Sequence, residues 1–168
     1  LGVGELEAEL RRAKRRIALL AALADLGGVW PLMQVTGALT ALADAAVHQC
    51  LTTLVGEEIR RRKLPGAVEA DAAEAAGMAA LAMGKMGAGE LNYSSDIDLI
   101  CLFDETRFDP SDYMEARTSF VRATRKMVAS LNDPTGDGYV FRTDLRLRPD
   151  PSVTPVCLAM EAAERYYE

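Results

Sequence analysis

Histidine is nearly absent from this chain, and cysteine is scarce. The only histidine, His48, lies in a stretch with helical periodicity far from the acidic residues discussed below, so mechanisms that need a Ser–His or Cys–His pair are excluded. Cys50, Cys101 and Cys157 are odd in number and widely spaced, which gives neither a disulfide framework nor a zinc-site spacing. The pattern is typical of packing cysteines in a reducing compartment, and we expect a cytoplasmic location.

The sequence also lacks a targeting segment and a long hydrophobic run. Basic residues between Arg11 and Arg16 interrupt the apolar stretches near the N-terminus, and no apolar run approaches the roughly 18 residues that span a bilayer. We therefore expect no membrane partner. The net charge of −6 excludes nucleic-acid binding by bulk electrostatics, and we interpret the basic run at residues 60–63 as a solvated helix end followed by a linker.

The remaining composition is that of a folded domain. With 168 residues, of which 49% are hydrophobic and 26% charged, the chain can bury one core and is too apolar for a disordered segment. Apolar residues three or four positions apart predict helices over residues 5–25 and 34–55. We divide the chain into a helical N-terminal segment, residues 1–70, and a core over residues 71–168. The start at Leu1 and the end inside a predicted helix suggest a fragment of a longer protein.

After Gly77 the periodicity changes to that of an α/β (α+β) domain. Residues 96–103 predict a central strand, because the part after its two acids is apolar on both faces. Residues 139–148 alternate between apolar and polar side chains, which predicts a half-exposed strand with Asp144 between arginines on its polar face. The predicted order is strand, glycine-rich flexible loop, strand, helix, strand and helix, at residues 79–83, 84–89, 96–103, 112–131, 139–148 and from 158 onward.

Acidic residues on the two later strands point to a metal site. Asp96 and Asp98 are two residues apart, so on an extended strand they would face the same side. If residues 139–148 pair beside this strand, Asp144 joins them. Neighbouring carboxylates repel each other, and a divalent cation is the simplest compensation. We predict that these three residues are catalytic and bind Mg²⁺, with Mn²⁺ as an alternative.

The glycine-rich loop and nearby polar residues predict a phosphate site. Glycines let the backbone approach a phosphate closely, hydroxyl groups donate hydrogen bonds, and arginines hold phosphate oxygens bidentately. The candidates are Gly84, Lys85, Gly87, Gly89, Ser94, Ser95, Arg142 and Arg146, with Arg148 as a further option. The loop is not a P-loop, because Met86 stands where Ser or Thr is required.

Each signal alone has a simpler interpretation. An Asp-x-Asp pair also occurs at solvated strand ends, glycines form ordinary turns, and arginines near aspartates form ordinary ion pairs. The combination of glycine-rich loop, Ser-Asp-x-Asp, helix and a further Asp on an alternating strand favours phosphate chemistry.

Two stretches of the sequence carry a family resemblance. Residues 83–100 read M-G-K-M-G-A-G-E-L-N-Y-S-S-D-I-D-L-I, and residues 140–149 read V-F-R-T-D-L-R-L-R-P. The glycines followed by Asp-x-Asp resemble the DNA polymerase β-like nucleotidyltransferase superfamily. The full strings resemble the glutamine synthetase adenylyltransferase/adenylyl-removing enzymes. This resemblance covers about residues 77–168, and it implies a polymerase β-like core with a small mixed sheet, preceded by helices.

The resemblance also implies a reaction. The family has two such domains: the N-terminal one removes AMP from a tyrosine of glutamine synthetase by phosphorolysis, releasing ADP, and the C-terminal one attaches AMP from ATP. Residues 91–97 and 141–144 resemble the deadenylylating half, because the other half more often has Gly-Tyr-Gly-Ser before its first acid and a glutamate at the position of Arg142. Residues 150–155 lack the glycines of the family's R-P-x-G-x-S-G-P ending, which affects the expected loop shape.

By this resemblance, Asp96 and Asp98 bind the metal, and Asp144 completes the site and positions or activates the attacking group. The implied substrates and products are ADP, ATP and inorganic phosphate. The implied protein partners are glutamine synthetase and the PII nitrogen-signalling protein. Two alternatives stay open: the ATP-dependent adenylylating domain, and a catalytically silent regulatory module of the same fold.

Overall fold

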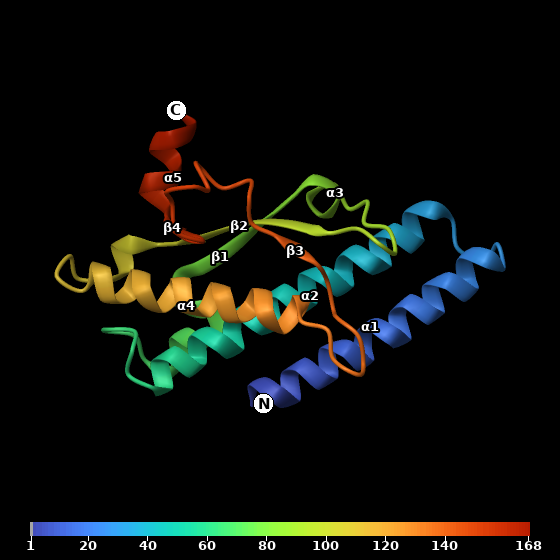
Figure 1. Ribbon diagram of the computed structural model, residues 1–168, viewed down its shortest axis with the longest axis horizontal. Helices are drawn as coiled ribbons and strands as arrows, with labels where there is room; N and C mark the ends of the chain where they lie inside the picture. The colour runs from blue at the N-terminus through green and yellow to red at the C-terminus, as the bar shows by residue number, and fades with distance from the viewer. Residues whose placement is uncertain (1) are drawn as a thin grey trace.

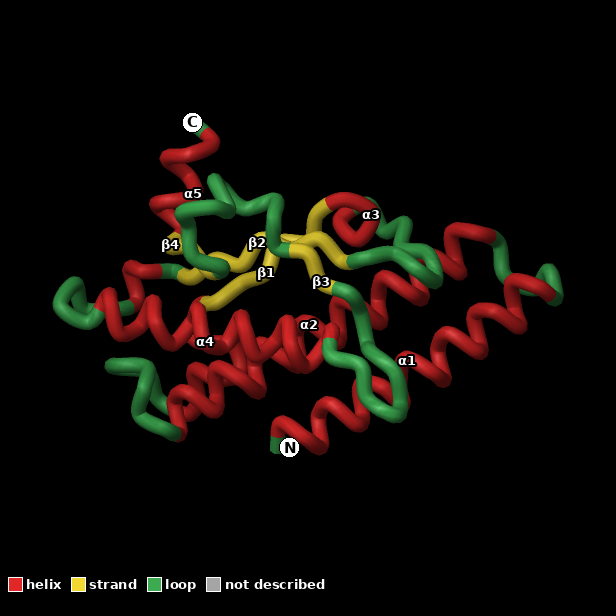
Figure 2. The backbone as a smooth tube through the Cα atoms, in the orientation of Figure 1, coloured by secondary structure: helices red, strands yellow, loops and turns green. Residues whose placement is uncertain are grey.

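A small four-stranded sheet lies against long helices in the computed structural model, which describes residues 2–168 (Figure 1). Helices dominate the chain, and the strands are short segments near the centre of the molecule (Figure 2). The predicted α/β class with a small mixed sheet is therefore confirmed. The elements are α1 (Val3–Leu26), α2 (Leu32–Arg60), η1 (Glu69–Gly77), β1 (Met78–Met83), α3 (Gly84–Gly87), β2 (Ile97–Phe103), η2 (Glu105–Arg107), α4 (Tyr113–Asn132), β3 (Thr143–Asp144), β4 (Cys157–Ala159) and α5 (Met160–Tyr167).

The two N-terminal helices form an antiparallel pair that lies under the sheet and beside α4 (Figure 1). The turn between them uses Gly28, whose φ of +67° is a conformation that glycine adopts at little cost. Helix α2 extends beyond the predicted 34–55, because its last turns still have a buried face that includes Glu58 and Ile59. Side chains from α1, α2, the sheet and α4 form one continuous hydrophobic core.

Helix α2 is long and apolar enough, by length and composition alone, to cross a membrane. No such segment was expected from the sequence, because charged and polar residues interrupt its apolar runs. In the structure 56% of its most apolar window is buried within the protein, and its inward side chains, such as Leu39, Ala43 and Leu54, belong to the core. This burial is the pattern of a core helix.

Strand β2 is the centre of the sheet. Strand β1 pairs antiparallel along one edge of β2, from Met78 opposite Phe103 to Met83 opposite Asp98. The other edge is shared by two short parallel strands: β3 pairs with the start of β2 and β4 with its end. All residues of β2 except Asp98 are buried, which agrees with the prediction of a central strand covered on both faces.

Two predicted elements are wrong. The expected ten-residue strand at 139–148 is only the two residues of β3, because Val140 and Phe141 instead donate backbone hydrogen bonds to the carbonyl of Leu131 at the end of α4. After β3 the backbone N–H of Arg146 donates to the Asp144 side chain at 2.8 Å and turns the chain away from β2. The expected flexible loop at 84–89 begins with a one-turn helix, α3.

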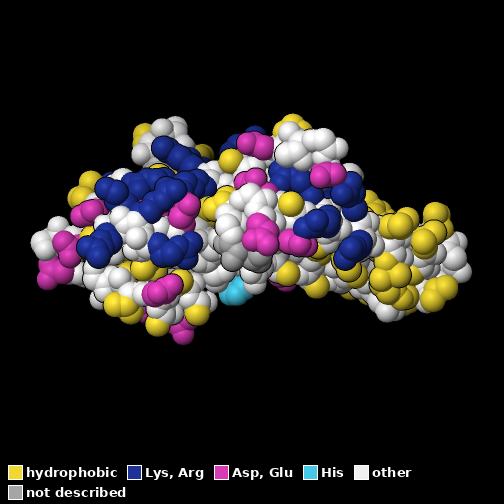
Figure 3. Space-filling model, turned by 90° about the horizontal axis from the view of Figure 1, so that it is seen from below, with side chains coloured by type: hydrophobic (Ala, Val, Ile, Leu, Met, Phe, Trp, Pro, Cys, Tyr) yellow, Lys and Arg dark blue, Asp and Glu magenta, His cyan; other side chains and the backbone are white. Residues whose placement is uncertain are grey.

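Apolar side chains are exposed at the end of the molecule where α1 turns into α2. Figure 3 shows a yellow patch at this tip, while lysines and arginines, with acidic side chains among them, lie over the middle and the other end of that view. Exposed apolar surface of this kind is typical of a contact face. The patch consists of Leu19, Leu20, Leu23, Leu26, Val29, Leu32 and Met33.

Helices α2 and α4 are joined by an ion cluster around a buried carboxylate. Glu58 is only 1% exposed, and its Oε2 accepts a hydrogen bond from Arg122 of α4 at 2.5 Å. Lys126 lies 3.7 Å from the other oxygen, Oε1, and donates to Glu57 at 2.7 Å. Because a buried charge without a partner is costly, the cluster fixes the position of α4 along α2.

The Arg122→Ala variant tests this cluster. We expect it to lower the free energy of unfolding by about 1–3 kcal/mol, because it removes the hydrogen bond to a buried carboxylate. Arg125→Ala, at an exposed position of the same helix, should change that free energy by less than about 0.5 kcal/mol. Urea denaturation of both variants is the measurement, and equal small losses would show that the cluster contributes nothing specific.

Candidate functional site

The start of β2 and the strand β3 bring two of the predicted acids side by side. In the parallel register, Ile97 is opposite Thr143 and Asp98 is opposite Asp144. The pairing is fixed by a backbone hydrogen bond from Ile97 N to the carbonyl of Arg142 at 2.8 Å. Asp98 and Asp144 are both partly buried. Asp96 lies one residue before β2 rather than within it, and it is exposed.

Gly84 of α3 packs directly against Asp98. Its φ is +55°, and a Cβ added at this position would lie 2.7 Å from Oδ2 of Asp98. Met83, the residue before it, is the antiparallel partner of Asp98. A side chain at position 84 would therefore be strained and would also displace the carboxylate, so glycine is required there for two independent reasons.

The loop between α3 and β2 is held by short side chains and by the N-terminal helices. Leu91 is fully buried, and its N–H donates to Thr40 Oγ1 of α2 at 3.4 Å. The side-chain oxygen of Asn92 accepts bonds from Ser94 N at 3.1 Å and Ser95 Oγ at 2.8 Å. Tyr93 donates its hydroxyl to Asp25 of α1 at 3.3 Å. The hydroxyl of Ser95, predicted to bind phosphate, thus closes this turn.

Two arginines hold the acids. Arg142 donates from Nε to Asp96 Oδ1 at 2.5 Å and from Nη2 to the carbonyl of Ser94 at 2.9 Å. Arg146 donates from Nε to both oxygens of Asp144, at 3.0 and 2.8 Å. The side-chain hydrogen bond from Arg146 is the main cause that lowers the pKa of Asp144, and the backbone bond adds to it. Asp144 is therefore ionised at neutral pH and is a weak base.

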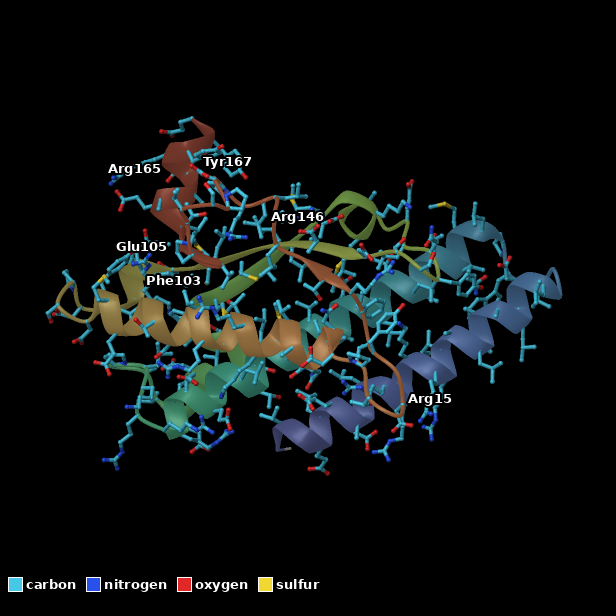
Figure 4. All side chains as sticks on the ribbon, in the orientation of Figure 1. Arg15, Phe103, Glu105, Arg146, Arg165 and Tyr167 are labelled. Atoms are coloured by element: carbon cyan, nitrogen blue, oxygen red, sulfur yellow. The ribbon has the colours of Figure 1, made fainter. Side chains whose placement is uncertain are left out.

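The charge of Arg146 links all three acids. Its pKa is raised, first by the hydrogen bond to Asp144 and by the charge of that residue, and then by the charges of Asp98 and Asp96. Figure 4 shows Arg146 above the middle of the sheet, where the chain leaves β3. Arg146 thus contacts Asp144 directly and shares the electrostatic field of Asp98 and Asp96.

A cavity of about 440 Å³ opens beside these residues, lined by Asp96, Arg142, Thr143, Asp144 and Arg146 together with Val128 and Leu145. A larger cavity of about 590 Å³ lies at the other end of β2, between η2, α4 and α5. Its charged groups are already engaged: Glu105 accepts the first backbone N–H groups of α5, and Arg165 pairs with Glu161. We place the candidate site at the smaller cavity because the ionisable groups converge there.

The remaining predicted phosphate ligands are less closely placed. Lys85, Gly87 and Gly89 lie on the short helix and the turn after it, and Lys85 is exposed. Arg148 is used differently from the expectation, because its guanidinium donates to the carbonyls of Leu145 at 2.7 Å and Pro151 at 2.9 Å. It therefore shapes the loop after β3, and a phosphate role for it is not supported.

Sequence reasoning missed the contribution of helix α1. Arg11 is buried and donates to the carbonyls of Asp133 and Gly138, each at 2.9 Å, which fixes the segment that leads into β3. Lys14 lies over the rings of Tyr139 and Phe141, 4.3 and 4.9 Å from their centroids. Burial is the main cause that lowers its pKa, and the charge of Arg142 adds to it. In the sequence both residues resemble solvent-facing members of an amphipathic helix.

The donor set suits a hard divalent cation in kind, because carboxylate oxygens are the ligands that Mg²⁺ prefers. The backbone register also suits it, with Asp98 beside Asp144. The side chains of Asp96 and Asp144, however, are turned to Arg142 and Arg146. Within residues 2–168 no three His, Cys, Asp or Glu side chains stand close enough together to share a metal ion. The metal-binding and catalytic roles of the three acids therefore stay a prediction.

A glycine turn against an aspartate of the central strand, with a second aspartate opposite it on a parallel neighbour, defines a nucleotidyltransferase-like α/β domain. Residues 4–168 match the family model described as glutamate-ammonia ligase adenylyltransferase. The chain belongs to this family, and the resemblance inferred from the sequence is confirmed.

Named relatives support the same assignment. The chain is 51% identical over 167 residues to the bifunctional glutamine synthetase adenylyltransferase/adenylyl-removing enzyme of Bradyrhizobium sp. (strain ORS 278), covering 99% of this chain and 17% of the relative. It is 54% identical over 160 residues to the enzyme of the same name from Bradyrhizobium diazoefficiens and 47% identical over 159 residues to that from Caulobacter vibrioides, covering 95% of this chain and 16% of each relative. The chain thus spans about a sixth of the length of these proteins.

A pair of glycine substitutions tests the packing against Asp98. Gly84→Ala and Gly89→Ala both place a side chain at positive φ, +55° and +73°, but only the first meets Asp98, since nothing lies within 4 Å of a Cβ at Gly89. We expect backbone strain to lower the free energy of unfolding of both variants by about 1–2 kcal/mol. Gly84→Ala should lose more than this, because its new methyl group also meets Asp98. Only Gly84→Ala should move the NMR signals of Asp98 and Asp144; equal shifts in both variants would contradict the contact.

Proposed function

We propose that this chain carries a metal-dependent site that removes AMP from a tyrosine of glutamine synthetase by phosphorolysis and releases ADP. The observation that carries the proposal is the register of β3 on β2, which sets Asp144 beside Asp98 next to the turn at Gly84. Metal-dependent nucleotidyl transfer needs carboxylates close enough to share a metal ion, and a backbone that a phosphate group can approach. Membership of the adenylyltransferase family supports the same class of reaction.

The direction of the reaction is inferred from the charges at the cavity. Phosphorolysis uses inorganic phosphate, an anionic nucleophile that needs neighbouring positive charge more than a strong base. Arg142 and Arg146 line the cavity, and the lowered pKa of Asp144 makes this carboxylate a poor general base near neutral pH. A glutamate at position 142 would instead repel phosphate. We therefore favour deadenylylation over ATP-dependent adenylylation.

In this proposal the work of the chain is to position groups and balance charge. Asp96, Asp98 and Asp144 would hold Mg²⁺ or Mn²⁺, which when bound neutralises the phosphoryl oxygens and orients the attacking and leaving oxygens. The Gly84 turn would admit the phosphates of the nucleotide close to the backbone. Arg142 would hold the incoming phosphate, while its bond to the Ser94 carbonyl keeps it at the mouth of the cavity.

The protein partners follow from the relatives and from the resemblance. The names of the relatives include glutamine synthetase as the protein that is modified, and we propose the same substrate for this chain. The PII signalling protein is proposed as the stimulating partner on the basis of the family resemblance. Both partners would be met in the cytoplasm.

An assay with adenylylated glutamine synthetase tests the proposal. Incubation of the chain with the adenylylated protein, inorganic phosphate and Mg²⁺ should release ADP. Asp98→Asn and Asp144→Asn should each lower the rate by at least about 100-fold, because each removes a charge that acts on the reacting phosphoryl group. Asp137→Asn, at an exposed position paired with Arg15, is the matched control and should retain the rate.

The outcomes separate the alternatives. Consumption of ATP with modification of unadenylylated glutamine synthetase would identify the adenylylating activity instead. Binding of glutamine synthetase without turnover, unchanged by Asp98→Asn, would identify a silent interaction module. The full-length protein is assayed in parallel, because the chain spans about a sixth of its relatives.

A further inference from the structure

Arg146 is held at the site by Asp144 alone. Its Nε lies 3.0 and 2.8 Å from the two carboxylate oxygens of Asp144, and its side chain is 83% exposed. The two neighbouring arginines are more firmly fixed: Arg142 also donates to the carbonyl of Ser94, and Arg148 donates to the carbonyls of Leu145, Pro151 and Thr154. An exposed ion pair is weakly held, so of these three side chains Arg146 is the one most free to move.

The same contact decides which way Asp144 faces. Asp144 is opposite Asp98 in the β2–β3 register, yet both of its oxygens are turned to Arg146. Within residues 2–168, no set of three acidic, cysteine or histidine side chains is close enough to share a metal ion. A divalent cation shared between Asp98 and Asp144 needs the oxygens that Arg146 occupies. The guanidinium and the metal therefore compete for one carboxylate.

Arg146 also lines the cavity that would receive the nucleotide phosphates. A guanidinium released from Asp144 would remain beside that cavity, because Arg146 lies only two residues after Asp144, the last residue of β3. Phosphate groups offer a guanidinium the same bidentate geometry as a carboxylate, with more charge. The side chain thus has a second acceptor as soon as a nucleotide enters.

We propose that Arg146 is a positioning residue that exchanges partners: it holds Asp144 before the metal binds, gives up this carboxylate to the divalent cation, and then binds the phosphates of the nucleotide. The inference rests on the proposed metal-dependent function. It predicts that metal and nucleotide bind cooperatively, because the metal releases the side chain that the nucleotide needs. It also predicts that loss of Arg146 changes the two affinities in opposite directions.

Binding measurements on the 168-residue chain test this exchange. Mn²⁺ alone is titrated and followed by electron paramagnetic resonance, and ADP is then titrated at saturating Mn²⁺ by calorimetry. Arg146→Gln should bind Mn²⁺ about three- to fivefold more tightly, because the competing cation is gone, and ADP about tenfold more weakly, because a charge-assisted contact is lost. Arg146→Lys should restore Mn²⁺ affinity towards the wild-type value, since it restores the charge.

Arg165→Gln is the matched control, since Arg165 is also exposed and also paired with one carboxylate, Glu161 of α5. The affinities of Arg165→Gln for Mn²⁺ and for ADP should both stay within about twofold of the wild-type values, since screening weakens long-range charge effects. If Arg146→Gln binds Mn²⁺ no more tightly than the wild type, the exchange is overturned. If Asp98→Asn in the same experiment loses Mn²⁺ binding, the proposed metal-dependent function still stands. Absence of Mn²⁺ binding in the wild type and in Arg146→Gln alike would contradict the metal-dependent function itself.

Discussion

The register between β2 and β3 is the constraint on which the site depends. Strand β1 covers one edge of β2, so β3 and β4 must share the other. A two-residue strand is too short to fix itself, and its neighbours supply the restraint. Val140 and Phe141 are bonded to the end of α4, and Arg11 of α1 binds carbonyls in the turn before them. The position of Asp144 beside Asp98 is therefore set by α4, which directly precedes β3, and by α1, which is distant in sequence.

This arrangement gathers negative charge, and the chain compensates it with arginines. Asp96 is paired with Arg142 and Asp144 with Arg146, while Asp98 is packed against Gly84. Because Arg142, Asp96 and Arg146 are each at least half exposed, both ion pairs contribute little to folding and leave the carboxylates available. The pair of Glu58 and Arg122 has the opposite character: it joins α2 to α4 through a carboxylate that is only 1% exposed. Carboxylate–arginine pairs thus stabilise the fold between α2 and α4, whereas at the candidate site they can separate and bind other partners.

Much of this could be predicted from local patterns. The periodicity of α1, α2 and α4, the apolar β2 and the Asp-x-Asp at its start were all visible in the sequence. The alternation at 139–148 was misleading, because it arises from two buried residues bonded to α4 and from arginines that bind loop carbonyls, and only Thr143 and Asp144 pair with β2. Tertiary hydrogen bonds decided that segment, and they leave no periodic signal.

Tertiary contacts of this kind also explain why the role of α1 could not be predicted from the sequence. They show that the N-terminal helices take part in positioning the candidate site. Asp25 binds Tyr93, Thr40 of α2 binds the backbone of Leu91, and Lys14 lies over the aromatic rings beside Arg142. The acids come from the sheet, but the loop before Asp96 and the segment before Asp144 are both anchored on the N-terminal helices. Since these helices and the sheet share one core, the helical segment is part of the machinery that positions the three carboxylates.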